Sequence, residues 1–268
     1  MINLVRMDLY RLLKSKSVYI CLAILLATSV LCFWIVWMFD TPEGNESAAR
    51  IGMSAITEIG VPGTLLINYD TLHMFREIAM DGGAYISLFG IVIVLFFCSD
   101  YNSGFMKNIM SLHRRRWKYI ASKLITAGIL DFCYLALHFG ICMLLNVLFH
   151  NLVPFAPAGD TLSYLCLTWT VTMGFAALLL LICTVTRSNG AGILATILLG
   201  SGILVLLVSY ITSLFGINQW AYYTLYYNHS QAPYTYNAIG DFKGYAVGAG
   251  FLALYAVISA VALARKDI

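Results

Sequence analysis

The basic side chains that could do chemistry are concentrated in one stretch, residues 103–123, SGFMKNIMSLHRRRWKYIASK, which holds six Lys and Arg and no acidic residue. Guanidinium and ammonium groups bind phosphates and carboxylates. The stretch lies between two apolar runs, SLFGIVIVLFFC before it and LITAGILDFCYLALHFGICMLL after it. This position predicts a short loop at a membrane surface, where the charges meet lipid phosphates or the acidic groups of a partner.

The second of these apolar runs carries two ionisable side chains, Asp131 and His138, seven positions apart. On a helix this spacing places both on nearly the same face. Ionisable groups at membrane depth are costly and usually face the bundle interior. Two interpretations stay open. Either the face lines a substrate cavity or touches a second subunit, or Asp131 lies near the inner boundary and pairs with Lys123 or a lipid-facing basic residue.

No arrangement typical of catalysis is present. The five histidines are scattered, and the chain has no HExxH, no GxSxG and no Cys/His cluster with zinc spacing. We therefore predict no catalytic residue, no metal ligand and no bound cofactor in this chain.

The elements that position these residues must lie in a membrane. The chain is 60% hydrophobic and only 11% charged, with a mean hydropathy of +0.82, whereas soluble domains carry about 25% charged residues. We predict an all-α membrane protein, one domain over 1–268, and no nucleic-acid partner. Its six spans are expected at about 17–39, 84–99, 119–148, 162–186, 190–211 and 244–264.

The distribution of Lys and Arg predicts the orientation. With the N-terminus in the cytosol, only Arg50, Arg76 and Lys243 of the 16 Lys and Arg lie outside. The positive-inside rule then places both termini in the cytoplasm. The outer loop after the fifth span is aromatic, and we expect 220–227 to dip into the outer interface or to form a short re-entrant turn. The alternative is a plain loop whose aromatic residues form an interfacial belt.

The N-terminal segment 1–16 has the pattern of an amphipathic helix. Ile2, Val5, Leu9, Leu12 and Leu13 recur on one face, and Asp8 lies on the rest of the wheel with the basic residues. We expect the helix to lie along the inner leaflet, either as a topological anchor or as a lipid-binding element. The expected inner-leaflet contacts are Arg6, Arg11 and Lys14.

The basic loop begins with a second amphipathic pattern at about 104–112. Phe105, Ile109 and Leu112 recur at i, i+4 and i+7, which predicts a short helix. The loop is too short to have a core of its own, so this apolar face must pack on the membrane domain or on another protein. The alternative is a solvated loop that only satisfies the positive-inside rule.

Residues of this loop resemble a known family. The positions that match are Asp100, Gly104, Lys107, Asn108, Ser111, Arg115 or Arg116, Tyr119 and Lys123. Together with the N-terminal helix and the six spans, they are similar to ABC-2 type permeases of bacterial ABC transporters, such as those for lantibiotic immunity or bacitracin. One departure is that Leu112, His113 and Arg114 follow Ser111, where many members have a proline.

The resemblance implies that 1–16 is a connecting helix and 104–112 a coupling helix that docks on a separate ATPase. The implied coupling residues are Gly104, Phe105, Lys107, Asn108, Ile109, Ser111, Leu112, Arg114, Arg115 and Arg116. The chain has no GxxxxGK[ST] motif, so ATP and Mg²⁺ would bind to the partner. It further implies two ATPase subunits, a second permease copy or paralogue, a bacterial plasma membrane, and export of an amphipathic peptide or drug.

Two other function classes remain open from the sequence. One is an integral membrane protein without an ATPase, such as a lipid-acting enzyme, an assembly factor or a sensor partner. The other is a passive channel, although no selectivity-filter pattern is present. The pair Gly244 and Gly248 is likewise open between a dimer seam and ordinary helix packing.

Overall fold

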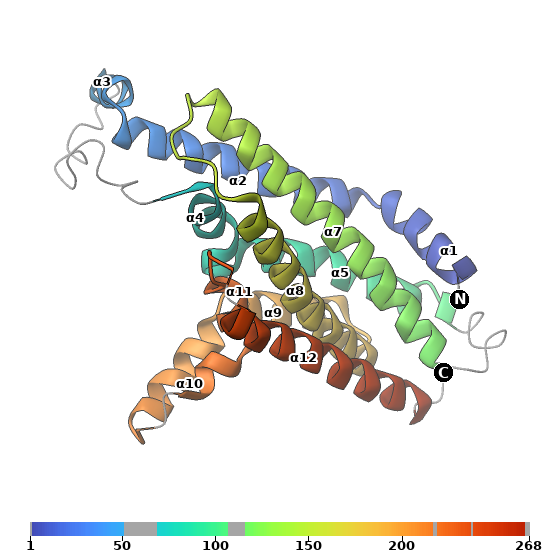
Figure 1. Ribbon diagram of the computed structural model, residues 1–268. Helices are drawn as coiled ribbons and strands as arrows, with labels where there is room; N and C mark the ends of the chain where they lie inside the picture. Colours follow the sequence, from blue (N-terminus) through green and yellow to red (C-terminus); the bar gives the residue numbers. More distant parts are fainter. Residues whose placement is uncertain (1, 51–68, 107–115, 217–218, 237, 266–268) are drawn as a thin grey trace.

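The computed structural model describes residues 2–50, 69–106, 116–216, 219–236 and 238–265, and in this part of the chain every regular element is a helix (Figure 1). The expected all-α membrane fold is confirmed. The main helices are α1 (Ile2–Leu13), α2 (Lys16–Asp40), α3 (Pro42–Arg50), α4 (Thr71–Phe75), α5 (Ala84–Asn102), α7 (Trp117–Leu148), α8 (Ala158–Thr186), α9 (Asn189–Gly200), α10 (Ile203–Ser213), α11 (Leu225–Ser230) and α12 (Ala238–Arg265).

Five helices of the described chain are long and apolar enough to cross a membrane, and a bent pair, α9 with α10, qualifies as a sixth span. In such helices every backbone donor and acceptor is satisfied within the segment, which is what lipid requires. Neighbouring spans alternate in direction, so the described ends of the chain lie at the same end of the bundle (Figure 1).

Helix α8 is the centre of the bundle and packs against α5, α7, α9 and α12. Its contact with α12 is close because glycines replace side chains there. A Cβ on Gly248 would lie 2.9 Å from the backbone oxygen of Thr170, and one on Gly244 would lie 2.7 Å from Leu167. The Gly244/Gly248 pair therefore packs against α8 of the same chain, which agrees with ordinary helix packing, one of the two interpretations that the sequence left open.

The second span begins earlier than the predicted residue 84. Helix α4 is capped by Asp70, whose Oδ1 accepts from the backbone N–H of Leu72 and His73 at 2.9 Å each. It continues through a π-helical turn, η2 (Arg76–Met80), and a 3-10 turn, η3 (Asp81–Gly83), into α5. Gly82 and Gly83 both have φ of 73°, a left-handed backbone conformation that glycine adopts without steric cost.

The fifth span is broken, whereas the sequence predicts a continuous helix over 190–211. Gly202 has φ of 72°, and a Cβ there would lie 2.2 Å from the ring of Tyr226. The two halves meet at 54°, and α10 projects away from the bundle (Figure 1). None of the residues of α10 is buried.

The segment after α10 folds back onto the bundle. A 3-10 turn, η4 (Gln219–Tyr223), is followed by α11, which Thr224 caps through the N–H of Tyr227. Leu225, His229 and Ser230 of α11 are buried, and α11 packs against α8 and α12. The expected aromatic loop thus contains a short helix that packs into the protein.

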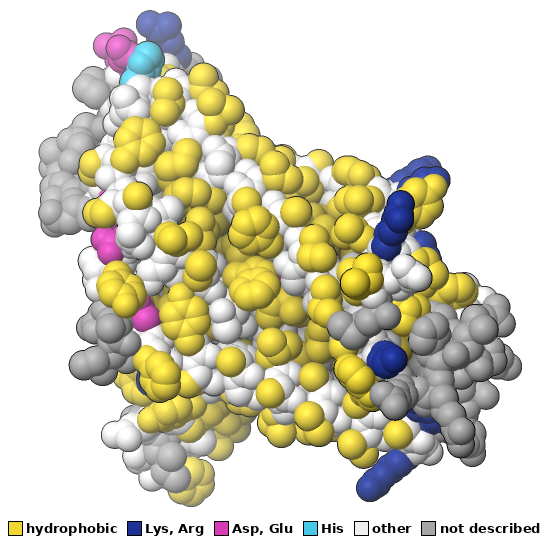
Figure 2. All heavy atoms as spheres, turned by 45° about the vertical axis from the view of Figure 1, so that its right-hand side comes forward, with side chains coloured by type: hydrophobic (Ala, Val, Ile, Leu, Met, Phe, Trp, Pro, Cys, Tyr) yellow, Lys and Arg dark blue, Asp and Glu magenta, His cyan; other side chains and the backbone are white. Residues whose placement is uncertain are grey.

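The two ends of the bundle differ in charge. Lys and Arg gather chiefly at one end of the face in Figure 2, and acidic side chains lie at the other. We use "basic end" for the end defined by Arg6, Arg11, Lys14, Arg116, Lys118 and Arg265. Between the two ends the visible face is mostly hydrophobic (Figure 2), as a lipid-facing surface must be.

Helix α1 lies at the basic end and packs against α7. The residues it buries are Leu4, Asp8 and Leu12. Ile2 and Leu13, which the sequence assigns to the apolar face, are 83% and 49% exposed. The predicted helix is present, but its buried side includes Asp8, which the sequence pattern places on the polar side.

Candidate functional site

A buried ion pair lies at the basic end, where α1, α5 and α7 meet. The ammonium Nζ of Lys123 lies 2.9 Å from Oδ1 of Asp8 and 2.7 Å from Oδ2 of Asp100. None of the three side chains is more than 2% exposed. A buried charge is tolerated only when it is paired and hydrogen-bonded, and here one lysine pairs with carboxylates from two different helices.

Three further side chains complete the pairing. Arg11 donates to Asp100 Oδ1 at 2.6 Å, the hydroxyl of Tyr119 donates to Asp100 Oδ2 at 2.9 Å, and Ser122 donates to Asp8 Oδ2 at 3.0 Å. Every oxygen of the two carboxylates therefore has a donor. The six residues, Asp8, Arg11, Asp100, Tyr119, Ser122 and Lys123, are called the ion-pair network below; it holds two acids and two bases.

The ion-pair network reaches the beginning of the basic loop. The Arg11 guanidinium lies over the ring of Phe105, 4.7 Å from its centroid. Phe105 is half-buried and Met106 is 2% exposed, so the first residues after Gly104 pack on the membrane domain. Gly104 itself has φ of 69°, a turn that suits glycine.

Only part of the predicted coupling segment can be located. Gly104 and Phe105 lie at the start of the described part of this segment, and Arg116 lies at its end. The other predicted residues lie outside the described chain: Lys107, Asn108, Ile109, Ser111, Leu112, Arg114 and Arg115.

Arg116 joins the end of the loop to α12. Its guanidinium donates to the backbone oxygens of Leu263 at 2.5 Å and Ala264 at 2.7 Å. Carbonyls in the last turn of a helix lack partners within that helix, and a cation there also offsets the negative end of the helix dipole. The loop thus starts at the ion-pair network and ends at the C-terminus of α12.

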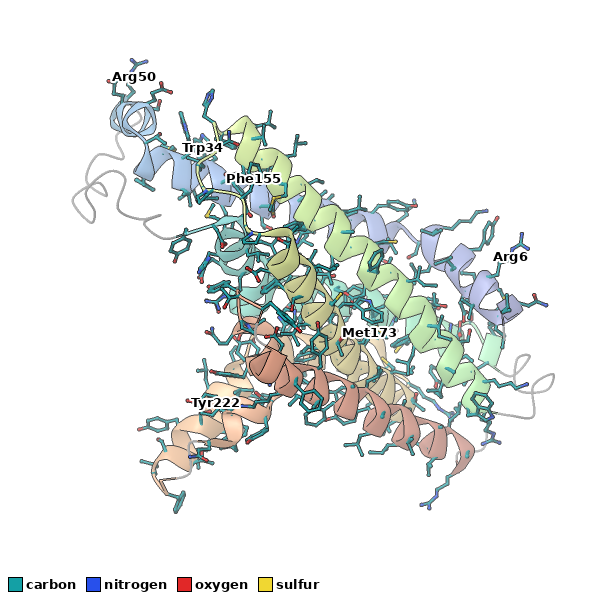
Figure 3. All side chains as sticks on the ribbon, viewed as in Figure 1. Arg6, Trp34, Arg50, Phe155, Met173 and Tyr222 are labelled. Carbon is teal, nitrogen blue, oxygen red and sulfur yellow. The ribbon has the colours of Figure 1, made fainter. Side chains whose placement is uncertain are left out.

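The predicted inner-leaflet residues separate into two groups. Arg6 and Lys14 are exposed; Arg6 points away from the bundle in Figure 3, and the Lys14 ammonium lies 4.5 Å from the ring centroid of Tyr10. Arg11 is different because it forms a salt bridge with Asp100, and only 31% of its side chain is exposed.

Asp131 and His138 lie inside the bundle and are both 0% exposed. The hydroxyl of Tyr85 donates to Asp131 Oδ1 at 2.7 Å, and His138 Nε2 shares a hydrogen bond of 2.7 Å with the hydroxyl of Ser29. Lys123 pairs with Asp8 and Asp100 instead, which corrects the interpretation that Asp131 pairs with Lys123.

Tyr85 connects this inner group. Its ring stacks at 6.2 Å on both His138 and His229. Within the described chain, Asp131 Oδ2, His138 Nδ1 and both ring nitrogens of His229 have no hydrogen-bond partner. Burial lowers the pKa of His229 to about 3, because the low-dielectric surroundings disfavour its charged form.

Sequence reasoning missed Asp8, Tyr85 and His229 as site residues. Asp8 had a signal, since it is the only acid in an otherwise basic N-terminal segment. No sequence signal marked Tyr85 or His229, because their contacts join segments that are far apart in the chain. In the described residues no group of three or more His, Cys, Asp or Glu side chains could hold a metal ion.

Two comparisons with known proteins bear on this arrangement. A family model described as "ABC-2 family transporter protein" matches residues 4–203. This range includes the whole ion-pair network and the basic loop. A search of curated proteins finds no match to the chain.

Proposed function

Since the chain belongs to the ABC-2 family of transporter proteins, we propose that it is the membrane permease of an ATP-driven exporter. The observation that carries the proposal is the ion-pair network, which fastens α1, α5 and α7 together beside the start of the predicted coupling segment. The proposed task of this network is to pass motion from that segment to the spans.

The energy source is proposed to be a separate subunit. ABC-2 permeases generally work with ABC ATPases, and this sequence contains no GxxxxGK[ST] motif with which to bind ATP itself. We propose two ATPase subunits, which bind ATP and Mg²⁺, and a second permease copy or paralogue across a central cleft.

The proposed mechanism follows from the two attachments of the basic loop. When the ATPases close, they displace residues 104–112. The displacement reaches α1, α5 and α7 through Phe105, Arg11 and Asp100, and it reaches α12 through Arg116. Buried, fully paired charges resist separation because an unpaired charge in the interior costs several kcal/mol, so the helix ends move as a unit and the cleft opens outward.

Orientation and cargo are proposed on the distribution of charge. The basic end would face the cytosol of a bacterial cell, as the positive-inside rule requires. The opposite end carries Glu43, Glu46, Glu77 and Asp81, which suits a cationic amphipathic peptide or drug. Asp131 and His138 are enclosed by α2, α5 and α7 of one chain, so they would meet cargo only after these helices separate.

Co-purification tests the proposal. The tagged full chain, isolated from the cells that naturally produce it, should retain an ATPase, and Phe105→Asp combined with Ile109→Asp should release it. Phe155→Asp is the matched control, because Phe155 is 56% exposed in the loop between α7 and α8, away from the basic end. If no nucleotide-binding protein is retained by the unaltered chain, the exporter proposal fails and a membrane protein without an ATPase replaces it.

A further inference from the structure

A long apolar groove follows α7 from the basic end into the bundle. It has a volume of about 620 Å³ and is lined by residues that include Ile125, Ile129, Phe132, Trp169, Met173 and Leu252. Helices α7 and α12 form its walls and α8 its floor; Met173 lies between the two walls in Figure 3. A second hollow of about 390 Å³ shares Phe132 and Trp169 and extends it towards Leu162.

The floor of this groove is closed to polar ligands. The one polar atom that Trp169 could offer, Nε1, donates to the backbone oxygen of Gly128 at 3.0 Å. Gly128 lies close to the floor, since a Cβ there would be 3.3 Å from the sulfur of Met173. The side chains that line an empty apolar groove lack dispersion contacts on their open side. In a membrane, the hydrocarbon chains of lipid surround the groove and can supply these contacts.

A basic residue, Lys118, lies at the end of the groove nearest the basic end. Lys118 precedes Ile125, Ile129 and Phe132 by 7, 11 and 14 residues, so all four lie on one stripe of α7. Trp117, which is 52% exposed, marks the headgroup level, where such rings are enriched. The described structure records no ion pair for Lys118, whereas the neighbouring Arg116 is bound to α12.

We propose that this groove binds an anionic phospholipid of the leaflet at the basic end. One acyl chain lies between α7 and α12 over Trp169 and Met173, and the phosphate pairs with Lys118. The charge of Lys118 favours a lipid with net negative charge, such as phosphatidylglycerol, over a zwitterionic one.

The shape of the rims favours lipid over a second copy of the chain. Helices that pack in membranes approach through small residues. The rims here are instead bulky and half-exposed: Ile125 is 40%, Ile129 39% and Phe132 66% exposed. A flexible chain can pass between such side chains, whereas a helix would be held away from the floor.

Photolabelling of the full chain in nanodiscs tests this assignment and needs no ATPase, so it is independent of the exporter proposal. The probes are phosphatidylglycerol and phosphatidylcholine, each with a diazirine on one acyl chain. We expect label on peptides that contain Ile125–Phe132 and Trp169–Met173, with about fivefold more from phosphatidylglycerol, the factor for one lysine near a phosphate.

Matched variants separate the headgroup from the chain contact. Lys118→Gln should reduce phosphatidylglycerol labelling to the phosphatidylcholine level, Lys118→Arg should retain it, and Lys16→Gln, an exposed lysine of α2 at the same end, should leave it unchanged. Ile125→Trp should fill the groove and reduce labelling by both lipids. Leu144→Trp, on the outer half of α7 and 55% exposed, should not.

Three results would overturn the proposal. The first is equal labelling by the two lipids in the unaltered chain, and the second is unchanged labelling in Lys118→Gln. The third is a disulfide-linked dimer formed by Phe132→Cys together with absence of label, which would show that a second copy covers the groove.

Discussion

Removal of the Lys123 ammonium tests whether the ion-pair network is as buried as its geometry indicates. In Lys123→Met, Asp100 keeps Arg11 at 2.6 Å and Tyr119 at 2.9 Å. Asp8 keeps only the Ser122 hydroxyl at 3.0 Å and is 1% exposed. Breaking a buried pair by removing one partner costs about 3–5 kcal/mol, so the free energy of unfolding should fall by that amount.

A second substitution identifies the cause. Asp8→Asn added to Lys123→Met leaves Arg11 with Asp100 as a balanced pair, so the double variant should be more stable than the sum of the two single losses predicts. Groups in one ionic network couple by about 0.5–3 kcal/mol. The control is Lys14→Met, because Lys14 is exposed and its loss should change stability by no more than about 0.5 kcal/mol.

The measurement is unfolding by SDS in mixed micelles, followed by tryptophan fluorescence. A loss below about 1 kcal/mol for Lys123→Met, the size typical of exposed pairs, would refute the reasoning. So would exact additivity of the two substitutions, because it would mean that Lys123 and Asp8 do not interact.

Three further outcomes are expected. Burial lowers the pKa of His229 to about 3 from its ordinary 6.5; the unfolded chain therefore binds the extra proton first, and stability falls as pH decreases below 6.5, by about 1.4 kcal/mol per pH unit. His229→Phe should reduce the pH dependence of stability by this contribution, and the exposed His150→Gln should leave the pH dependence unchanged, as pH-dependent unfolding would show. Tyr85→Phe leaves Asp131 Oδ1 without its donor at 2.7 Å and should cost about 1–3 kcal/mol in the SDS assay, whereas Tyr223→Phe, 60% exposed, should cost almost nothing. Gly248→Ala places a Cβ 2.9 Å from the Thr170 oxygen and should lower stability by about 1–3 kcal/mol; Gly250→Ala, with nothing within 4 Å, should not.

Span location could be predicted from the sequence because lipid imposes one simple requirement. A run of about 20 apolar residues must form a helix in hydrocarbon. The predicted start of the third span at 119 and its end at 148 lie within a few residues of α7 (Trp117–Leu148). Where the run was short, as at 84–99, an extension of the span was open from the sequence, but its start at Thr71 could not be fixed.

The break at Gly202 illustrates what the sequence left open. The glycines around Ser201 suit both close helix packing and a bend, and the two readings have the same local pattern. The choice depends on Tyr226, whose ring occupies the space where a side chain at 202 would lie. A contact between residues 24 positions apart cannot be inferred from local hydrophobic periodicity.

Only some members of the ion-pair network could be identified from the sequence. Asp100, Tyr119 and Lys123 were singled out through a family resemblance, but Asp8, the second carboxylate that pairs with Lys123, was assigned to the polar face of α1. Periodicity sorts residues by polarity and therefore places every charge in water. It cannot identify a carboxylate that is buried because a lysine from another helix neutralises it, as Lys123 does at 2.9 Å.

The basic loop contacts the membrane domain differently at its two ends. Phe105, near its beginning, contacts the ion-pair network, whereas Arg116, at its end, donates to backbone oxygens of α12. The network end must hold three helices that approach from different directions, and paired charges fix both their distance and their register. The Arg116 end needs only to hold the terminus of α12, for which two carbonyl oxygens suffice. Since α7 and α12 both pack on α8, the proposed mechanism would pass a displacement of the loop into the bundle on two sides of its central helix. That arrangement favours a tilt of α7 and α12 about α8 over a sliding of any single span.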